Sequence, residues 1–182
     1  QSAIYTILDA MVRLIAPILA FTADEIWLAM RHDAGANAGH VMLNDMPEPD
    51  PAHTFDAETA ERFGLVIALR EDVNKALELA RSEKILGKPL DARVTLFVSE
   101  DARADFEKIA GLPLSTLFIV SDTAVVYGGG EGYESEAFKH VKIKITPCAT
   151  PKCVRCWAHS ARVGEDAGHP ELCPRCTAVV SG

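Results

Sequence analysis

The beginning of the chain carries apolar residues at helical spacing, which form one broad stripe: Ile4, Ile7, Leu8, Met11, Leu14, Ile15 and Ile18. This pattern predicts an amphipathic helix that packs against other helices. Pro17 lacks a backbone donor and disfavours a helical conformation at Ala16. We therefore expect the first helix to kink or stop at this proline.

A second helix start is predicted at Thr22, because Thr22 and Glu25 have the spacing of a capping box. In such a box the threonine hydroxyl accepts from the backbone of the glutamate, and the glutamate side chain reaches back to the cap. Phe21 and Ile26 have the positions of a hydrophobic staple across that cap. We expect a short helix that begins there and ends at about Arg31.

Residues 32–55 are rich in Gly, Asn, Asp and Pro, so we expect a long loop. A helix of about 25 residues should begin near Asp56, and its apolar positions have helical spacing: Phe63, Val66, Ile67, Leu69, Val73, Ala76, Leu77 and Ala80. The polar face of this helix carries Arg70, Asn74 and Arg81. That face has two interpretations, a solvated surface or a contact with a partner.

Beyond Gly87–Pro89 the hydrophobic period changes from helical to strand-like, so a domain boundary is predicted there. Three strands and a short helix are expected next: strands at Val94–Val98, Thr116–Val120 and Ala124–Tyr127, and a helix at Asp101–Ala110. The three consecutive glycines within residues 128–135 lack the strand-to-helix context of a phosphate loop. We predict no nucleotide site at that loop.

The segment Val141–Ile145 alternates between apolar and polar residues, which predicts a half-buried strand. Its valine and isoleucines should face the core. Lys142 and Lys144 should then project together from the open face of a sheet. Helices followed by a small mixed sheet predict the α+β class for the chain.

Two Cys-x-x-Cys pairs follow, Cys153 with Cys156 and Cys173 with Cys176. Each pair offers two sulfur atoms from one tight turn, and two turns supply the four soft ligands that tetrahedral zinc prefers. Four thiolates leave no position for water, so we predict one structural Zn²⁺ ion and no hydrolytic chemistry. Two disulfides or a redox motif are the alternative, but nothing here resembles the secretory signal of an oxidising compartment.

Three other potential ligands lie near the pairs: Cys148, His159 and His169. We interpret Cys148 as a packing residue that could replace a lost ligand. The two histidines could reach the metal, but four thiolates already complete its shell.

Charge is unevenly distributed along the chain. The net charge is −8, but residues 139–182 carry seven Lys/Arg and three acidic residues, so the preceding part carries −12. A basic module suits contact with a polyanion, because phosphate neutralisation is local and more distant charge is screened over about 10 Å. The alternative to contact with a polyanion is a basic surface that is only solvated. The longest apolar run, Leu14–Phe21, is interrupted by proline and too short for a bilayer, so no membrane partner is expected.

The run Ala16–Trp27 resembles the anticodon-binding helical domain of the class I aminoacyl-tRNA synthetases for isoleucine, valine and leucine. The segment Lys84–Ala92 is similar to that of the bacterial isoleucyl-tRNA synthetases, and so are the cysteine pairs within Lys152–Trp157 and Leu172–Cys176. This resemblance spans nearly the whole chain in the right order. It implies a C-terminal fragment, in agreement with Gln1 in place of an initiating methionine.

Three parts are implied by the resemblance: anticodon-binding helices at 1–86, a small α/β junction domain at 87–147 and a zinc-binding module at 148–182. The implied partners are isoleucine tRNA and the rest of the synthetase chain, in a cytoplasmic monomer. The parent enzyme joins isoleucine to its tRNA with ATP and Mg²⁺. The ATP-handling signatures, of the His-Ile-Gly-His and Lys-Met-Ser-Lys-Ser types, are absent. We therefore expect this chain to recognise and position tRNA without activating an amino acid.

Five residues are candidates for RNA contact: Arg155, Trp157, Arg175, Lys142 and Lys144. An indole can stack on an unpaired base, and a guanidinium can hold a phosphate or a base edge. For Trp157 the alternative is a hydrophobic lid over the metal. Two other functions stay open. DNA glycosylases for oxidised purines end in a similar finger but begin with a catalytic Pro-Glu that has no equivalent here, and a protein-interaction zinc module would bind no nucleic acid.

Overall fold

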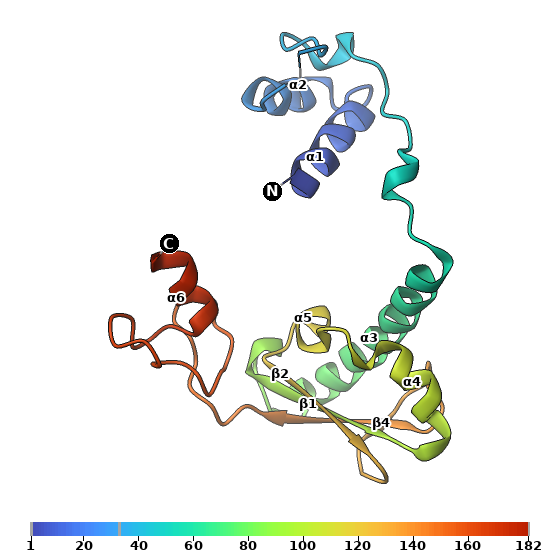
Figure 1. The fold of residues 1–182 in the computed structure, drawn as a ribbon, viewed down its shortest axis with the longest axis vertical. Helices are drawn as coiled ribbons and strands as arrows, with labels where there is room; N and C mark the ends of the chain where they lie inside the picture. Colours follow the sequence, from blue (N-terminus) through green and yellow to red (C-terminus); the bar gives the residue numbers. More distant parts are fainter. Residues whose placement is uncertain (1, 33, 182) are drawn as a thin grey trace. The chain divides into compact units, whose positions relative to one another are not determined.

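The computed structural model describes residues 2–32 and 34–181, which form two compact units divided between Thr54 and Phe55. The described part of the first unit is helical. The second unit contains helices and a four-stranded sheet (Figure 1). It also includes the two cysteine pairs. This combination confirms the α+β class. Within the described ranges, no helix has both the length and the apolar character that a membrane span requires.

The first unit is built on α1 (Ser2–Ile15) and α2 (Ala20–Ala29). α1 stops just before Pro17, as the missing donor predicts. The two helices and the short turn η1 (Val41–Leu43) enclose a small core: Val12, Ala16, Ala23, Trp27 and Val41. Most of the predicted apolar stripe is nevertheless exposed in this unit: Ile4, Ile7, Met11, Leu14 and Ile18.

The capping box predicted at Thr22 is wrong. α2 begins two residues earlier, and Leu19 occupies its cap without a side-chain hydrogen bond. The N–H of Ala23 already donates to the Leu19 carbonyl over 2.8 Å, so Thr22 lies inside the helix rather than at its start. Phe21, expected in a staple, is 94% exposed. The helix also ends two residues earlier than expected.

The expected long loop follows α2 and contains η1 and a second short turn, η2 (Pro51–His53). Asp24 of α2 holds the loop, because its carboxylate accepts from the N–H of Val41 at 2.9 Å and lies 3.0 Å from Nδ1 of His40. The backbone hydrogen bond from Val41, followed by the contact with His40, lowers the pKa of Asp24. The charged form of the Asp24 carboxylate therefore holds the loop in place.

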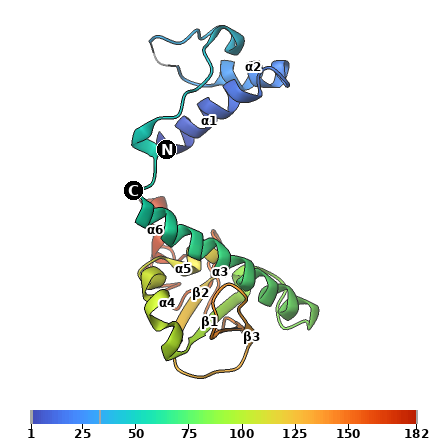
Figure 2. The same cartoon turned by 90° about the vertical axis from the view of Figure 1, so that its right-hand side faces the viewer.

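The second unit begins with α3 (Ala57–Ser82), which confirms the long helix expected near Asp56. The Asp56 carboxylate caps this helix by accepting from the N–H of Thr59 at 2.7 Å, and that bond lowers the pKa of Asp56. α3 runs across the sheet (Figure 2). One face of α3 is buried in the same apolar core as the inner face of the sheet. The long helix and the sheet thus form one packed domain, which we call the sheet domain.

The strand order in the sheet is β2-β1-β4-β3. The bounds are as follows: β1 (Ala92–Val98), β2 (Asp122–Tyr127), β3 (Tyr133–Glu134) and β4 (Val141–Pro147). β1 pairs in parallel with β2 and antiparallel with β4. The connection from β1 to β2 contains α4 (Arg103–Ala110), as predicted, and α5 (Leu114–Phe118). These two helices and α3 share one core with the inner face of the sheet. Among the residues that the structure describes, no helix of this core lies on the other face.

The strand predicted at Thr116–Val120 is wrong, because α5 occupies most of this stretch. Leu114 and Phe118 lie about one helical turn apart, and both are buried in the core. Ile119 then adopts a left-handed conformation, with φ of 58°, and ends the helix. A short apolar run does not distinguish a strand from a buried helical turn.

β4 alternates as predicted, with Val141 and Ile143 buried, Ile145 partly buried, and Lys142 and Lys144 exposed. The register places Lys142 opposite Phe97 of β1. Because directly opposed residues point to the same side of a sheet, both lysines lie on its open face.

A buried carboxylate joins α3 to the segment before β4. Asp72 is 2% exposed and accepts from the Ser135 hydroxyl at 2.7 Å and from the Ala137 N–H at 2.8 Å. Lys75 Nζ lies 3.4 Å away. Burial acts to raise the pKa of Asp72, but these three donors outweigh it and lower that pKa. The charged carboxylate is therefore part of the folded structure.

The C-terminal module follows β4 and ends in α6 (Pro174–Ser181). An isolated bridge joins Lys152 and His159 within it. Its small core consists of three cysteines with a few partly buried neighbours: Cys153, Cys173, Cys176, Cys156, Val163 and Leu172. The domain boundaries after residues 86 and 147, the first of which was also predicted from the change of hydrophobic period, stay predictions.

Candidate metal centre

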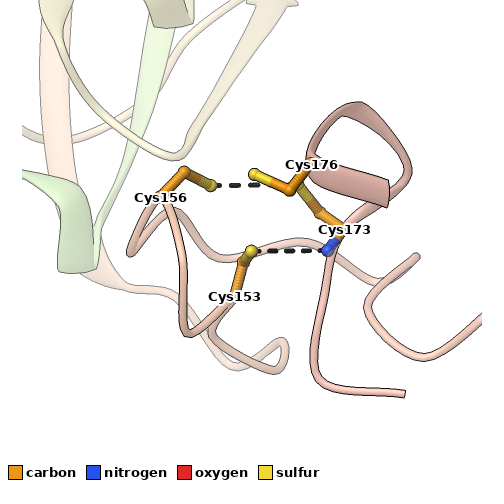
Figure 3. A group of neighbouring side chains, drawn as sticks. All are labelled: Cys153, Cys156, Cys173 and Cys176. Carbon is orange, nitrogen blue, oxygen red and sulfur yellow. Dashed lines mark hydrogen bonds between the residues drawn. The ribbon is translucent and has the colours of Figure 1, made fainter. Parts of the chain in front are cut away.

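Four sulfur atoms come together in the C-terminal module (Figure 3). The sulfur atoms of Cys153, Cys156, Cys173 and Cys176 all lie within 4.8 Å of one another. Three of these residues are buried, and Cys156 is half-buried. The structure thus brings together the two pairs that are separate in the sequence.

Each pair is formed by one tight backbone turn. In the first, the N–H of Trp157 donates to the Cys153 carbonyl at 2.8 Å. In the second, Pro174 opens α6, and the N–H of Cys176 donates to the Cys173 carbonyl at 2.9 Å. Proline suits a first helical position because its φ is already helical. The local sequence therefore directs both sulfur atoms of each pair toward one centre.

Hydrogen-bond donors around the centre favour the thiolate form of two cysteines. The Cys173 N–H donates to the Cys153 sulfur at 3.4 Å. Burial acts to raise the pKa of Cys153, but the N–H groups of Cys156, Cys173 and Arg155 outweigh it and lower that pKa to about 6. The side chain of Arg155 is the main cause of the lowered pKa of Cys176. Burial raises the pKa of Cys173 instead.

Two arginines contact the sulfur atoms reciprocally. Arg155, from the first pair, donates from Nη1 to the Cys176 sulfur at 3.6 Å. Arg175, from the second pair, donates to the Cys156 sulfur, and this hydrogen bond raises the pKa of its guanidinium. A zinc ion with four thiolates has a charge of about −2. Two guanidinium groups balance that charge, and both side chains are also exposed to solvent.

The arrangement fits zinc. Zinc–sulfur bonds of about 2.3 Å in a tetrahedron place sulfur atoms about 3.8 Å apart. The Cys156 and Cys173 sulfur atoms are 3.8 Å apart. An all-sulfur set leaves no position for water, as in structural sites, so the ion supplies folding free energy when bound.

The other candidate ligands lie outside this cluster. His159 directs its ring nitrogens elsewhere, with Nδ1 2.6 Å from the Thr150 carbonyl and Nε2 3.3 Å from the Asp91 carboxylate. His169 is not part of the group of four. Cys148 is half-buried, and burial raises the pKa of its thiol, which agrees with a packing residue.

Asp91 anchors the module to the sheet domain. It ends the short turn η3 (Pro89–Asp91) that precedes β1. Its Oδ1 lies 2.6 Å from Nζ of Lys152 and 3.3 Å from Nε2 of His159. The hydrogen bond from Lys152 is the main cause of the lowered pKa of Asp91. The Cys148 N–H also donates to the Asp91 carbonyl at 2.8 Å, so backbone and side chain hold the same junction.

The five candidates for RNA contact lie in two places. Arg155, Trp157 and Arg175 are exposed on the cysteine turns. Lys142 and Lys144 are exposed on the open face of β4. Trp157 is 60% exposed, so most of its indole faces solvent.

Lys88 and Asp91 form contacts that the sequence did not predict. Lys88 Nζ lies 5.7 Å from the ring centroid of Trp157, a cation–π contact worth about 0.5–1 kcal/mol when exposed. Trp157 has φ of 64°, a left-handed conformation that costs a non-glycine residue about 1–2 kcal/mol. The cation–π contact therefore offsets only part of the backbone cost. Lys88 and Trp157 are far apart in the sequence, and no local pattern predicts that they meet.

Two family models match the chain. The family described as "Anticodon-binding domain of tRNA ligase" matches residues 1–96. The family described as "Zinc finger found in FPG and IleRS" matches residues 151–179, which include all four clustered cysteines. The match and the cluster together support a structural zinc ion as the cofactor of the module.

Curated relatives align with essentially the whole chain. The isoleucine–tRNA ligase of Syntrophotalea carbinolica is 41% identical over 181 residues, which are 100% of this chain and 19% of the relative. The ligase of Bacillus licheniformis is 42% identical over 183 residues, which are 99% of this chain and 19% of the relative. The ligase of Geobacter sulfurreducens is 39% identical over 181 residues, with the same coverage. The chain thus spans about a fifth of the length of these relatives, and the resemblance drawn from its residues is confirmed.

Proposed function

The chain belongs to the family of anticodon-binding domains of tRNA ligases, and we propose that it is the C-terminal, tRNA-binding part of an isoleucine–tRNA ligase. One observation carries this proposal: an anticodon-binding match and a closed four-sulfur finger occur in one chain, in that order. The chain recognises the anticodon region of isoleucine tRNA and positions the molecule. The rest of the longer protein performs aminoacylation with ATP and Mg²⁺.

In this proposal the four cysteines hold one zinc ion and thereby fix the surface that presents Arg155, Trp157 and Arg175. An exposed indole provides a platform for an unpaired base, and guanidinium groups hold phosphate oxygens through charge-assisted hydrogen bonds. Lys142 and Lys144 contact the RNA backbone from the sheet, which adds affinity without reading bases. The zinc is structural and takes no part in the ligation.

A DNA-binding finger is the second candidate, because the matching finger family is also named for FPG. The anticodon-binding match over residues 1–96 favours tRNA over DNA. A protein-interaction module is the third candidate and would bind neither nucleic acid. As part of the first proposal, the longer protein works as a monomer in the cytoplasm.

Binding to isoleucine tRNA tests the proposal directly. Fluorescence anisotropy would compare the zinc-loaded chain with labelled isoleucine tRNA, the same tRNA with a changed anticodon, and a DNA duplex of similar charge. We expect the unchanged tRNA to bind most tightly. Equal affinity for all three would refute anticodon recognition, and preference for the duplex would favour the second candidate.

A second experiment tests the assignment of catalysis to the rest of the longer protein. The chain alone should show no isoleucine-dependent exchange between pyrophosphate and ATP, because it lacks both ATP-handling signatures. Exchange above the level of a buffer control would contradict the assignment of catalysis to the rest of the longer protein.

A further inference from the structure

Trp157 is presented to solvent by a strained backbone. Its left-handed φ of 64° is a conformation that glycine adopts without cost. A bulky residue in this region is an outlier that packing must stabilise or function must explain. The indole is 60% exposed, so burial provides little compensation. The turn of the first cysteine pair holds this backbone conformation, and it leaves the indole available to a ligand.

Lys88 is the cation nearest to this indole. It lies in the connection between α3 and β1, and its Nζ is 5.7 Å from the ring centroid. Among the residues that the structure describes, no carboxylate lies within ion-pair distance of Lys88. The nearby Asp91 carboxylate is already engaged by Lys152 and His159. The charge of Lys88 is thus available to an anionic ligand.

The contact between Lys88 and Trp157 depends on how the zinc module is docked. Asp91 lies three positions after Lys88 and holds Lys152 and His159 of the module. The N–H of His159 also donates to the Ser121 hydroxyl at 2.7 Å. Because these bonds span the junction, they fix the distance between the sheet domain and the cysteine turn. Asp91 is therefore a positioning residue for the pair.

We propose that Lys88 and Trp157 form one composite site for an unpaired nucleotide of RNA, with Asp91 holding its two halves together. The base stacks on the indole, and the ammonium of Lys88 contacts the adjoining phosphate. This inference rests on the proposed tRNA-binding function and adds to it a residue of the sheet domain. Neither half suffices alone, since a stacked base and its phosphate need an aromatic face and a cation side by side.

A nucleotide fits these observations better than a peptide. Lys88 lies beside the exposed indole, and Arg155 and Arg175 are exposed on the cysteine turns, which matches the combination of a stacking platform with cations used for single-stranded nucleic acid. An acidic peptide would use the cations but would leave the aromatic face without a stacking partner. Binding of such a peptide is an outcome that the test below separates.

The test compares Lys88→Met with Lys84→Met in the zinc-loaded chain. Both residues are exposed lysines of the same connection, so the two variants lose the same charge. Affinity for labelled isoleucine tRNA is measured by anisotropy from low to high salt. Lys88→Met should weaken binding about 3- to 10-fold and reduce the slope of log affinity against log salt by about 0.7, the value for one single-strand phosphate. Equal effects of the two substitutions would overturn the composite site.

A double-mutant cycle tests whether the two residues act together. If they bind one nucleotide, Lys88→Met should have little further effect in a Trp157→Ala background. Additive effects would show two independent contacts and overturn the proposal. Tryptophan emission gives a second signal, since a stacked base should quench the part of the fluorescence that Trp157→Ala lacks. Quenching by a polyglutamate peptide equal to that by RNA would also overturn it.

The positioning role of Asp91 has a separate readout. Asp91→Ala should retain one zinc per chain and should abolish the extra effect of Lys88→Met over Lys84→Met. An unchanged difference between these variants would remove Asp91 from the site. Failure of the unmodified chain to bind any RNA would refute the proposed function itself. Normal RNA binding with no specific role for Lys88 would refute only the composite site.

Discussion

The sheet domain and the zinc module are joined by a few bonds, yet they are stabilised in different ways. The sheet domain encloses a continuous apolar core between its inner face and three helices. The core of the module consists largely of its own cysteines. Because so small a module buries little apolar surface, its folding depends on the metal, whereas the sheet domain depends on packing and on buried hydrogen bonds. Neighbouring parts of one chain can thus respond to different perturbations.

Removal of zinc should give the largest effect, and it should unfold the zinc module but not the sheet domain. Structural zinc contributes on the order of 10 kcal/mol to such modules, so chelation should unfold the residues after Pro147 and leave β1 and α3 folded. Metal analysis should first find one zinc per chain, and NMR spectra before and after chelation would show which residues change. A folded module in metal-free protein would contradict this prediction.

Single cysteine variants sharpen the same prediction. Cys176→Ser should lose zinc, because one of four thiolates is missing. Cys148→Ser provides the matched control, since its sulfur lies outside the cluster and it should retain a full zinc content. Equal metal loss in both variants would show that the clustered set is incomplete.

Asp72→Ala should destabilise the sheet domain but leave the zinc content unchanged. The substitution leaves the Ser135 hydroxyl and the Ala137 N–H without their buried acceptor, which should cost about 3 kcal/mol. Urea unfolding followed by NMR signals of β1 measures this change. A loss of zinc at denaturant concentrations where the sheet is still folded would contradict the separation of the two regions.

The same carboxylate predicts how stability depends on pH. The pKa of Asp72 is lower in the folded protein than its ordinary value of about 3.9 in unfolded chains. Its contribution is therefore fully present above about pH 4 and is lost as pH falls through the lower folded pKa. Below pH 4 the free energy of unfolding of the sheet domain should fall more steeply in the unmodified protein than in the Asp72→Asn variant. Parallel pH profiles of the two proteins would argue against this role.

Trp157→Ala should affect RNA binding without affecting either fold. If the indole stacks on a base, its removal should cost about 1–3 kcal/mol in affinity for isoleucine tRNA, with one zinc still bound. Zinc analysis and anisotropy on the same sample measure both quantities. A fall in zinc content before any loss of RNA binding would instead identify the side chain as a cover for the metal.

Lys142→Ala should have the smallest effect, because it removes one proposed phosphate contact on the sheet. Binding should weaken about threefold for isoleucine tRNA and for a tRNA with a changed anticodon alike, and the salt dependence should flatten. Lys139→Ala, a charge change before the strand, is the control. Loss of discrimination between the two tRNAs would place Lys142 at a base rather than at the backbone.

The features visible in the sequence are those with a strict local period or spacing. The alternation around Lys142 and Lys144 predicted which side chains of β4 face the core, and the cysteine spacing predicted the cluster of sulfur atoms. Two local patterns misled. Thr22 and Glu25 have capping-box spacing inside a helix that begins earlier, and the apolar run near Phe118 is helical because its spacing also fits a buried turn.

The rest of the candidate site depends on contacts across long stretches of chain. Arg155 and Arg175 were predicted as RNA contacts, but their approach to the opposite cysteine pair requires the folded centre. Lys88 meets Trp157 across the junction at which Asp91 contacts Lys152 of the module. A single sequence contains no period that relates such residues, so their proximity becomes evident only in three dimensions.

The junction at Asp91 also has a consequence for the order of events during synthesis. Asp91 precedes Lys152 by 61 residues, and the strands that build its platform, β1, β2 and β4, all precede the first cysteine pair. At about 5–20 residues per second, the ribosome completes the anchor roughly 3–12 seconds before its partner lysine. The last of these strands, β4, ends at Pro147, six residues before Cys153. At the same rate, β4 is complete about 0.3–1.2 seconds before the first cysteine. The anchor and all the strands around it are thus synthesised before the first metal ligand.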